Sequence, residues 1–176
     1  MTVHILRLGH RIARDKRITT HCALVSRALG AEKMLYAGQR DTGLEHSVSK
    51  VVADFGGPFA LAYAQDWKKA MTEFQKSRGK VVHLTVYGIP LQNSIKEIRK
   101  TKKLLAVVGG EKVPPAVYQQ ADWNISVTSQ PHSEIAALAV FLHELFQGRE
   151  LMKKFRNTKR KIIPQVQGKK LIQLVR

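Results

Sequence analysis

The chain has 176 residues, of which 44% are hydrophobic, and this is enough to bury the core of one domain without disulfides or metal ions. No apolar run approaches the roughly 20 residues that span a membrane. Arginines follow the short apolar start, whereas in a secretory signal they precede it. The single cysteine, Cys22, excludes an internal disulfide. We therefore expect a cytoplasmic protein with no targeting segment and no membrane association.

Thirty Lys and Arg residues against 13 Asp and Glu give a formal net charge of +17, which is more than solubility requires. The excess lies near the two ends of the chain, where Asp15 is the sole acid of the N-terminal basic block and no acid follows Glu150. A heat-adapted surface would also be rich in glutamate, which is scarce here, so we predict an RNA or DNA partner. The cations predicted to contact it are Arg7, Lys16, Lys153, Lys154, Arg156, Lys159, Arg160 and Lys161.

Hydrophobic patterns predict strands at 3–8, 33–37, 59–64, 81–86, 104–108 and 123–127. Helices are predicted between and after them, from Thr19 or Thr20 to 29 and at 47–55, 66–77, 91–101 and 133–146. Asp66 and Ser133 are placed to cap two of these helices, and Pro90 precedes a third. The alternation predicts an α/β fold with a mostly parallel sheet covered by helices on both faces.

The sequence after Gly148 has a different character, because basic residues prevail and the alternation stops. Two short apolar runs, 162–163 and 171–175, flank Gln167-Gly168, and this pattern predicts a small hairpin. We therefore divide the chain into an α/β domain at 1–150 and a basic C-terminal extension at 151–176.

The sequence lacks both common phosphate-binding fingerprints. The residues after the first predicted strand, LGHRIARDKR, contain one glycine where a dinucleotide fold needs G-x-G-x-x-G. The run Gly109-Gly110-Glu111-Lys112 lacks the spacing of a Walker A loop. Dinucleotide binding and ATP hydrolysis are therefore disfavoured.

Small and polar residues instead end three late strands, at 84–88, 109–113 and 128–133. Ligands of open α/β sheets bind outside the carboxyl ends of the strands, and glycines let the main chain approach a flat ligand closely. Three such loops predict a site for a ligand with adenine and ribose but no phosphate. The alternative is that Gly109-Gly110 only ends a strand.

The histidines and arginines allow different chemistry. No histidine has the spacing of a metal site, so we expect no metal. His132 lies in the third ligand loop, whereas we interpret His83, inside a predicted strand, as a hydrogen-bonded core residue. Arg11, Arg14 and Arg17 precede the first predicted helix, and if that segment is irregular they face the ligand loops, as an enzyme acting on an RNA backbone would need. The alternative for each arginine is a solvated basic surface.

Four stretches resemble one known family. They are LRLGHRIARDKRITTH (6–21), HLTVYG (83–88), VVGGEKVPPAVYQQADWNISVTSQPHSEIAALAVFL (107–142) and KKFRNTKRKIIPQ (153–165). In these stretches the chain resembles the archaeal tRNA (cytidine-56) 2′-O-methyltransferases, a family of the SPOUT class. The resemblance implies a C-terminal deep trefoil knot with S-adenosylmethionine held in it, and a homodimer on which the C-terminal extension packs. It also implies methylation of the 2′-hydroxyl of cytidine 56 in the T-loop of tRNA.

The resemblance also implies roles for single residues. Related enzymes place an arginine of their first motif at the 2′-oxygen, so Arg14 and Arg17, followed by Arg11, are the predicted catalytic residues. The pKa of a guanidinium exceeds about 12, so orienting the hydroxyl and shielding phosphate charge is its larger role. The chain departs from the family pattern because its first helix carries no asparagine. The predicted cofactor residues are Leu84, Tyr87, Gly88, Gly109, Gly110, Glu111, Lys112, Val113, Val127, Thr128, Ser129, Gln130, Pro131, His132 and Ser133.

Two alternatives stay open at this point. One is a SPOUT methyltransferase with another RNA target, because nothing in the residues identifies a nucleotide. The other is a non-catalytic RNA-binding α/β protein, which explains the charge but not the three ligand loops.

Overall fold

The computed structural model of the protein describes residues 1–110 and 112–174, apart from the side chain of Lys16. Its centre is a six-stranded sheet with the spatial order β3-β2-β1-β5-β4-β6, and every neighbouring pair is parallel. The strands are β1 (Thr2–His10), β2 (Lys33–Gly38), β3 (Ala60–Tyr63), β4 (Lys80–Pro90), β5 (Lys103–Gly109) and β6 (Trp123–Ser126). The order of the strands reverses between β1 and β5, so their carboxyl ends lie side by side at a point where such sheets bind ligands.

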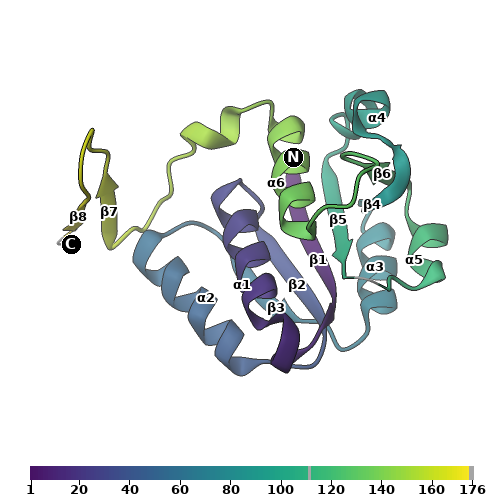
Figure 1. Cartoon of the computed structure of the whole chain (residues 1–176), viewed down its shortest axis with the longest axis horizontal. Coiled ribbons are helices and arrows are strands. Elements are labelled where there is room, and N and C mark those ends of the chain that lie inside the picture. Colours follow the sequence, from purple (N-terminus) through teal and green to yellow (C-terminus); the bar gives the residue numbers. More distant parts are fainter. Residues whose placement is uncertain (111, 175–176) are drawn as a thin grey trace.

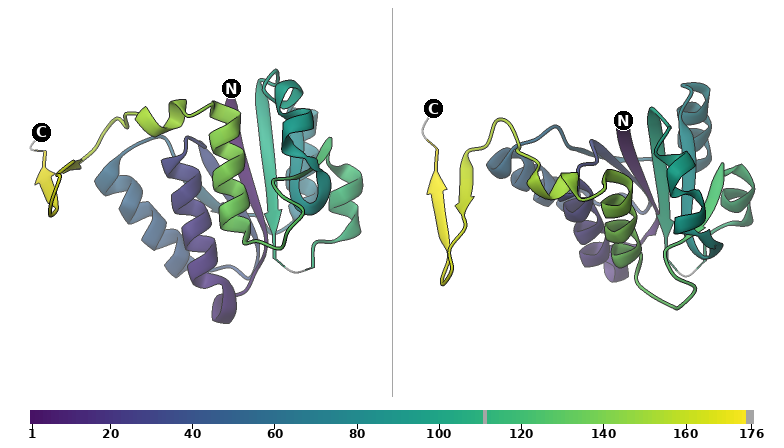
Figure 2. Two further views of the ribbon diagram at one scale, coloured as in Figure 1. Left: turned by 45° about the horizontal axis from the view of Figure 1, so that its top comes forward. Right: turned by 90° about the horizontal axis from the view of Figure 1, so that it is seen from above.

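Helices cover both faces of the sheet (Figures 1 and 2). On one face lie α1 (Ile12–Ala28), α2 (Thr42–Phe55), α4 (Leu91–Ile98) and α6 (Glu134–Phe146), and on the other lie α3 (Trp67–Lys76) and α5 (Pro115–Gln120). Side chains alternate along β1, so Ile5 belongs to the core under α1 and Leu6 to the core under α3. The predicted α/β class and the covering of both faces are confirmed.

Helix α1 begins at Ile12, well before the predicted start at Thr19 or Thr20. Two contacts satisfy its first backbone N–H groups: Asp15 accepts from the N–H of Arg11 at 3.2 Å, and the side-chain oxygen of Gln39 accepts from the N–H of Ile12 at 2.8 Å. Gln39 is distant in sequence, so the residues around Ile12 give no signal of this second cap. Arg11 is the residue that precedes α1, and Arg14 and Arg17 lie on the helix, so the condition of an irregular segment is not met.

Strand β4 continues past the predicted end at Val86. It pairs with β6 at Leu84 and, after a break in register, again at Ile89, which lies opposite the same Ile125. Between these points Gly88 lies so close to β6 that a Cβ atom there would be 2.5 Å from the backbone of Ile125. The bulge of β4 therefore packs against β6 at a point where only glycine fits.

The C-terminal extension begins with a short 3-10 helix, η1 (Arg149–Met152), and ends in the antiparallel pair β7 (Arg160–Ile163) and β8 (Lys170–Gln173). The predicted hairpin is thus confirmed, although residue 175 lies outside the described residues. The hairpin projects beyond α2 (Figure 2). The segment before it lies on the end of α2, where the N–H of Gly57 donates to the carbonyl of Arg156 at 2.9 Å and the guanidinium of Arg27 lies 4.5 Å from the centre of the Phe155 ring.

The sole cysteine, Cys22, lies on α1 against the sheet and is fully buried. Burial raises the pKa of its thiol to about 12. Within the described part of the chain, no helix combines the length and the apolar character that crossing a bilayer requires.

Candidate functional site

A cavity of 390 Å³ lies at the carboxyl ends of β4 and β5, and we call it the β4–β5 cavity. Its wall comes from the ends of these two strands, from the first turns of α1 and α6, and from α5. It includes seven of the predicted cofactor residues, Leu84, Tyr87, Gly109, Gly110, Val113, Pro131 and His132. Parts of all three predicted ligand loops therefore meet at one site.

The other predicted cofactor residues lie elsewhere. Ser133 caps α6 by accepting from the N–H of Ala136 at 3.2 Å, and Gly88 packs against Ile125. Lys112 lines a neighbouring cavity, and Glu111 lies outside the described residues. The remaining residues are not part of the described cavity wall; they are Val127, Thr128, Ser129 and Gln130.

The structure separates the three candidate arginines. Arg11 and Arg14 both line the β4–β5 cavity, whereas Arg17 is exposed further along α1 and is not part of its described wall. Arg11 is held by Asp15, whose carboxylate accepts from its Nε at 2.8 Å. This hydrogen bond, together with the nearby charge of Arg7, lowers the pKa of Asp15 below its usual range, so Asp15 stays ionised.

Arg7 has a structural role that differs from the predicted one. Its side chain is 1% exposed, donates to the carbonyl of Leu8 at 2.7 Å, and lies 3.3 Å from a carboxylate oxygen of Glu134 and 3.9 Å from one of Asp15. It thereby joins β1 to the starts of α1 and α6, beneath the cavity. Burial prevents contact with a polyanion, so the expectation that Arg7 binds nucleic acid is wrong.

His83 is buried as predicted, but it is not fully hydrogen-bonded and it lines the β4–β5 cavity. The amide of Asn124 donates to the carbonyl of Tyr118 at 2.9 Å, which turns its oxygen toward Nδ1 of His83 at 2.9 Å. Nδ1 therefore carries the proton and Nε2 is an acceptor, and Nε2 has no hydrogen-bond partner among the described residues. Burial lowers the pKa of His83, so the ring is neutral at neutral pH.

Several residues of the β4–β5 cavity wall were not among the predicted site residues. Tyr118 lies on α5, a helix that was not predicted, and its hydroxyl is 3.2 Å from that of Thr85. The pair Pro114-Pro115 was an available signal, since proline favours the first position of a helix. Glu134 lines the cavity and accepts a hydrogen bond from Arg7, which is distant in sequence, so no local pattern indicates this contact.

A second cavity, of 610 Å³, meets the first, and we call it the Trp67 cavity. The two share Arg11, Gly110 and Val113. The Trp67 cavity also includes the ends of β1 and β2, the start of α3, and Lys112. The carboxyl edge of the sheet thus carries two adjoining hollows.

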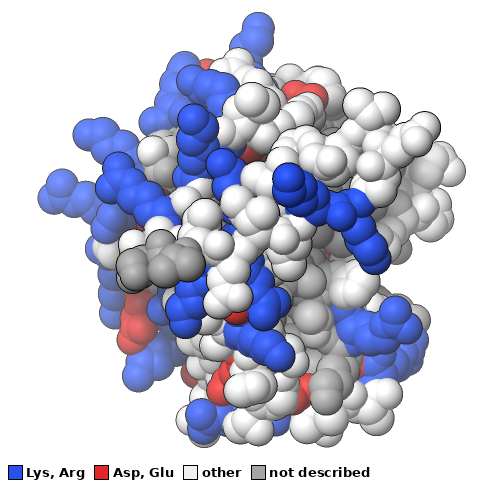
Figure 3. Space-filling model, turned by 90° about the vertical axis from the view of Figure 1, so that its left-hand side faces the viewer, with Lys and Arg blue, Asp and Glu red and all other residues white. Residues whose placement is uncertain are grey.

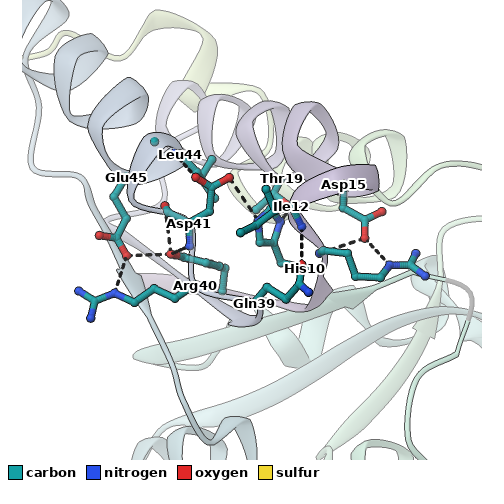
Figure 4. A network of polar contacts seen from close by, with 12 residues as sticks. His10, Ile12, Asp15, Thr19, Gln39, Arg40, Asp41, Leu44 and Glu45 are labelled. Atoms are coloured by element: carbon teal, nitrogen blue, oxygen red, sulfur yellow. Dashed lines mark hydrogen bonds and ion pairs between the residues drawn. The ribbon is translucent and has the colours of Figure 1, made fainter.

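A polar network fixes the edge between β1 and α2 (Figure 4). Nδ1 of the buried His10 lies 2.8 Å from the hydroxyl of Thr19, and its Nε2 lies 3.6 Å from a carboxylate oxygen of Asp41. Asp41 also caps α2 by accepting from the N–H of Leu44 at 2.9 Å. Burial and the charge of Arg7 lower the pKa of His10, so this network holds a neutral imidazole.

Basic side chains gather on the face that carries the hairpin (Figure 3). The described candidates of the extension are all exposed: Lys153, Lys154, Arg156, Lys159, Arg160 and Lys161. Arg160 lies 3.5 Å from Asp54, and Lys153 donates to the carbonyl of Gly30 at 3.2 Å. The side chain of Lys16 lies outside the described residues. In the part of the chain that the structure describes, no cluster of metal-binding side chains is found.

Comparison with known proteins reveals a match over most of the chain. Residues 55–172 match a family model described as tRNA ribose 2′-O-methyltransferase, aTrm56. A tRNA (cytidine(56)-2′-O)-methyltransferase of Thermococcus kodakarensis is 52% identical, covering 98% of this chain and 97% of its own length. One with the same description from Methanocaldococcus jannaschii is 50% identical over 98% and 97%.

The fold is also found among solved structures. The SpoU methyltransferase AviRb of Streptomyces viridochromogenes, in complex with the cofactor AdoMet, superposes with a TM-score of 0.61. It is 15% identical, and the match covers 84% of this chain and 58% of AviRb. The predicted SPOUT-type fold is therefore confirmed, while the deep trefoil knot stays a prediction.

Proposed function

The chain belongs to the tRNA ribose 2′-O-methyltransferase family, and on this premise we propose that it methylates the 2′-hydroxyl of cytidine 56 of tRNA, with S-adenosylmethionine as the methyl donor. The observation that carries the proposal is the β4–β5 cavity. It joins three strand-end loops to Arg11 and Arg14, and its 390 Å³ fall within the size range of small-molecule sites.

The cavity suits an adenosyl ligand without phosphate. Gly109 and Gly110 bring main chain to its edge, and Leu84 and Val108 supply apolar wall. The acceptor Nε2 of His83, which has no partner among residues 1–110 and 112–174, would take a hydrogen bond from an adenine amino group or a ribose hydroxyl, because a buried acceptor without a partner costs free energy. These residues would hold S-adenosylmethionine, whose methyl–sulfur bond would break as the methyl group passes to the 2′-oxygen, so that S-adenosylhomocysteine leaves and the hydroxyl proton passes to water.

The chain's own residues would provide positioning and charge. Arg14 lines the cavity, and as a permanent cation it would orient the 2′-hydroxyl and offset phosphate charge. Arg11, fixed by Asp15 at 2.8 Å, would hold the neighbouring backbone of the RNA in place. Neither guanidinium is expected to accept the proton.

We also propose that the protein acts in the cytoplasm as a homodimer and that the extension packs on the partner subunit. The support is a set of apolar side chains that the extension exposes, with exposed fractions from 52% to 104%: Leu151, Met152, Ile162, Val166 and Leu171. Exposed apolar groups of this density mark interaction surfaces.

The test is to incubate the protein with unmodified tRNA and S-adenosylmethionine, and to map the methylated nucleotide. We expect a 2′-O-methyl group on cytidine 56. Methylation of a different nucleotide would establish another RNA target, and binding of tRNA without methylation would support the non-catalytic alternative.

A pair of variants on α1 tests the catalytic assignment. Arg14→Ala is expected to lower turnover by at least about 100-fold with unchanged calorimetric binding of S-adenosylmethionine, because the donors that orient the reacting oxygen are lost. Arg17→Ala removes the same charge from the same helix outside the described cavity wall, and is expected to retain turnover. Full activity of Arg14→Ala would contradict the role given to it.

A further inference from the structure

The Trp67 cavity is larger than the β4–β5 cavity, and the role proposed for the cofactor leaves it unused. We propose that it holds the base of the target nucleotide, turned out of the RNA. The ribose would then lie over the shared residues Arg11, Gly110 and Val113. This inference rests on the proposed function and extends it to how the target is recognised.

The two cavities adjoin each other at the residues that they share. In a nucleoside the base and the 2′-oxygen are attached to adjacent carbons of the ribose, so a base and its 2′-hydroxyl must occupy neighbouring spaces. A base in the Trp67 cavity would direct its ribose toward the shared wall, and thus toward the β4–β5 cavity and Arg14. Enzymes that modify a nucleotide in folded RNA or DNA commonly extrude it into such a recess.

The lining of the cavity suits a flat heterocycle. The indole of Trp67 is half-buried and packs on the core cluster of Leu8 and Ala37, both of which also line the cavity. Aromatic faces stack on nucleobases with a gain of about 1–3 kcal/mol per base. The ammonium of Lys68 lies over the indole, 5.6 Å from the ring centre, so a base that stacks on this face of Trp67 would displace the ammonium toward the phosphates. A Cβ atom at Gly9 would meet no described residue within 4 Å, so the described atoms leave open space beside the apolar wall.

Gln39 supplies a directional polar group at the same site. Its Oε1 accepts from the N–H of Ile12 at 2.8 Å (Figure 4), so the amide presents Nε2 as its donor. Cytosine has an unprotonated ring nitrogen, N3, beside its carbonyl oxygen, whereas the corresponding nitrogen of uracil carries a hydrogen. If the donor of Gln39 bonds N3, it favours cytosine over uracil, because uracil carries a hydrogen at that position.

The support for Gln39 is rigid. Its own N–H donates to the carbonyl of His10 at 2.8 Å, and a Cβ atom at the preceding Gly38 would collide with that same carbonyl. The ends of β1 and β2 are thus held in close contact beneath the cavity. Arg11 and Lys112 lie on its wall as cations suited to the phosphates on either side of an extruded nucleotide.

Two glutamine-to-glutamate variants with the same change in charge test whether Gln39 recognises the base. Gln39→Glu keeps an oxygen for the N–H of Ile12 and replaces the donor by an acceptor. Gln65→Glu adds the same charge at an exposed position outside the described wall of the Trp67 cavity. We expect Gln39→Glu to lower kcat/KM for tRNA with cytidine 56 by roughly 10-fold to 100-fold, and to lower the preference over a uridine 56 transcript. Gln65→Glu is expected to keep that preference, and both are expected to bind S-adenosylmethionine normally.

Stacking is tested in the same way, with Trp67→Leu expected to raise the KM for tRNA and Trp67→Phe expected to restore it. A measurement that needs no methyl transfer accompanies these variants. The chain has two tryptophans, so Trp123→Phe leaves Trp67 as the sole indole, whose fluorescence should be quenched by T-arm RNA with cytidine 56.

The base site is overturned if Gln39→Glu keeps the preference for cytidine and the RNA does not quench the fluorescence of Trp67. Methylation of tRNA by the unaltered enzyme would still support the proposed function in that case. If the unaltered enzyme methylates no tRNA, the proposed function fails, and quenching by the RNA alone decides whether the cavity receives a base.

Discussion

Beneath the β4–β5 cavity the buried cation Arg7 faces two carboxylates of the cavity wall. Arg7 is 1% exposed and lies within 3.9 Å of both Asp15 and Glu134. Removing one partner from such a group leaves an uncompensated buried charge, so the cost of a substitution exceeds what the intact pair contributes. The position of Arg11 at the cavity depends on the same carboxylate of Asp15.

Asp15→Asn should destabilise the fold in a manner that depends on pH. The pKa of Asp15 is lowered below its ordinary value of 3.8, chiefly by the hydrogen bond from Arg11, so its stabilising effect is complete above that pH and is lost as pH falls through the lowered pKa. We expect the variant to lose about 1–3 kcal/mol of unfolding free energy at neutral pH, and the gap to close in acid. Denaturant titrations across the pH range measure this.

Asp66→Asn is the control, because Asp66 is an exposed cap of α3 and asparagine caps a helix equally well. Stability curves for Asp15→Asn and the unaltered protein that stay parallel down to strongly acid pH would contradict the assignment.

Among the elements, the bulged pairing of β4 with β6 depends on one residue. The pattern of apolar residues predicted that β4 ends at Val86, yet it continues to Pro90 because Gly88 lets it pair again with Ile125. Residues on both sides of the bulge line the β4–β5 cavity or start α4, so the geometry of the bulge positions the site.

Gly88→Ala should therefore destabilise the protein by about 1–3 kcal/mol, as expected for overpacking, and should weaken S-adenosylmethionine binding. Gly110→Ala is matched to it, since a Cβ atom at Gly110 would meet nothing within 4 Å. We expect the second variant to melt at the temperature of the unaltered protein. Equal melting temperatures for both variants would show that the bulge of β4 tolerates a side chain at position 88.

The elements that could be predicted are those whose signals are local. Apolar runs bounded by small and polar residues located the six strands of the sheet, and the caps Asp66 and Ser133 were read correctly because each bonds a backbone N–H three residues on. The start of α1 could not be read, because its cap comes from Gln39 on another loop. Similarly, Arg7 resembled a surface cation until the fold brought Glu134 beside it, and His83 resembled a satisfied core residue until Asn124 fixed which nitrogen is unpaired.

At the scale of the whole molecule, the basic extension and the cavities lie apart. The extension carries exposed Lys and Arg side chains and packs on the end of α2, whereas both cavities lie at the carboxyl edge of the sheet, with Arg11, Arg14 and Lys112 on their walls. An RNA long enough to contact both would bind the extension through its phosphates and present its target nucleotide at the edge. Substitutions in the extension should then change affinity without changing which nucleotide is recognised.

The triple variant Lys154→Ala, Arg156→Ala and Lys161→Ala should weaken tRNA binding most at low salt. Each lost phosphate contact should reduce the slope of log affinity against log salt concentration by about 0.7–0.9. Binding of S-adenosylmethionine should be unchanged. Affinity measured over a range of salt concentrations checks this, with the charge-matched triple variant Lys76→Ala, Lys96→Ala and Lys102→Ala, on other exposed surfaces, as the control. A loss of affinity that is independent of salt would exclude phosphate contacts.

The placement of Cys22 has a practical consequence. A thiol that is fully buried and has a pKa of about 12 carries almost no thiolate at neutral pH, so alkylating reagents should leave the folded protein untouched. Since it is the sole cysteine, one engineered on the hairpin or beside Trp67 would accept a fluorophore at a single chosen place. The docking of RNA on either region can then be followed by energy transfer without first deleting any native residue.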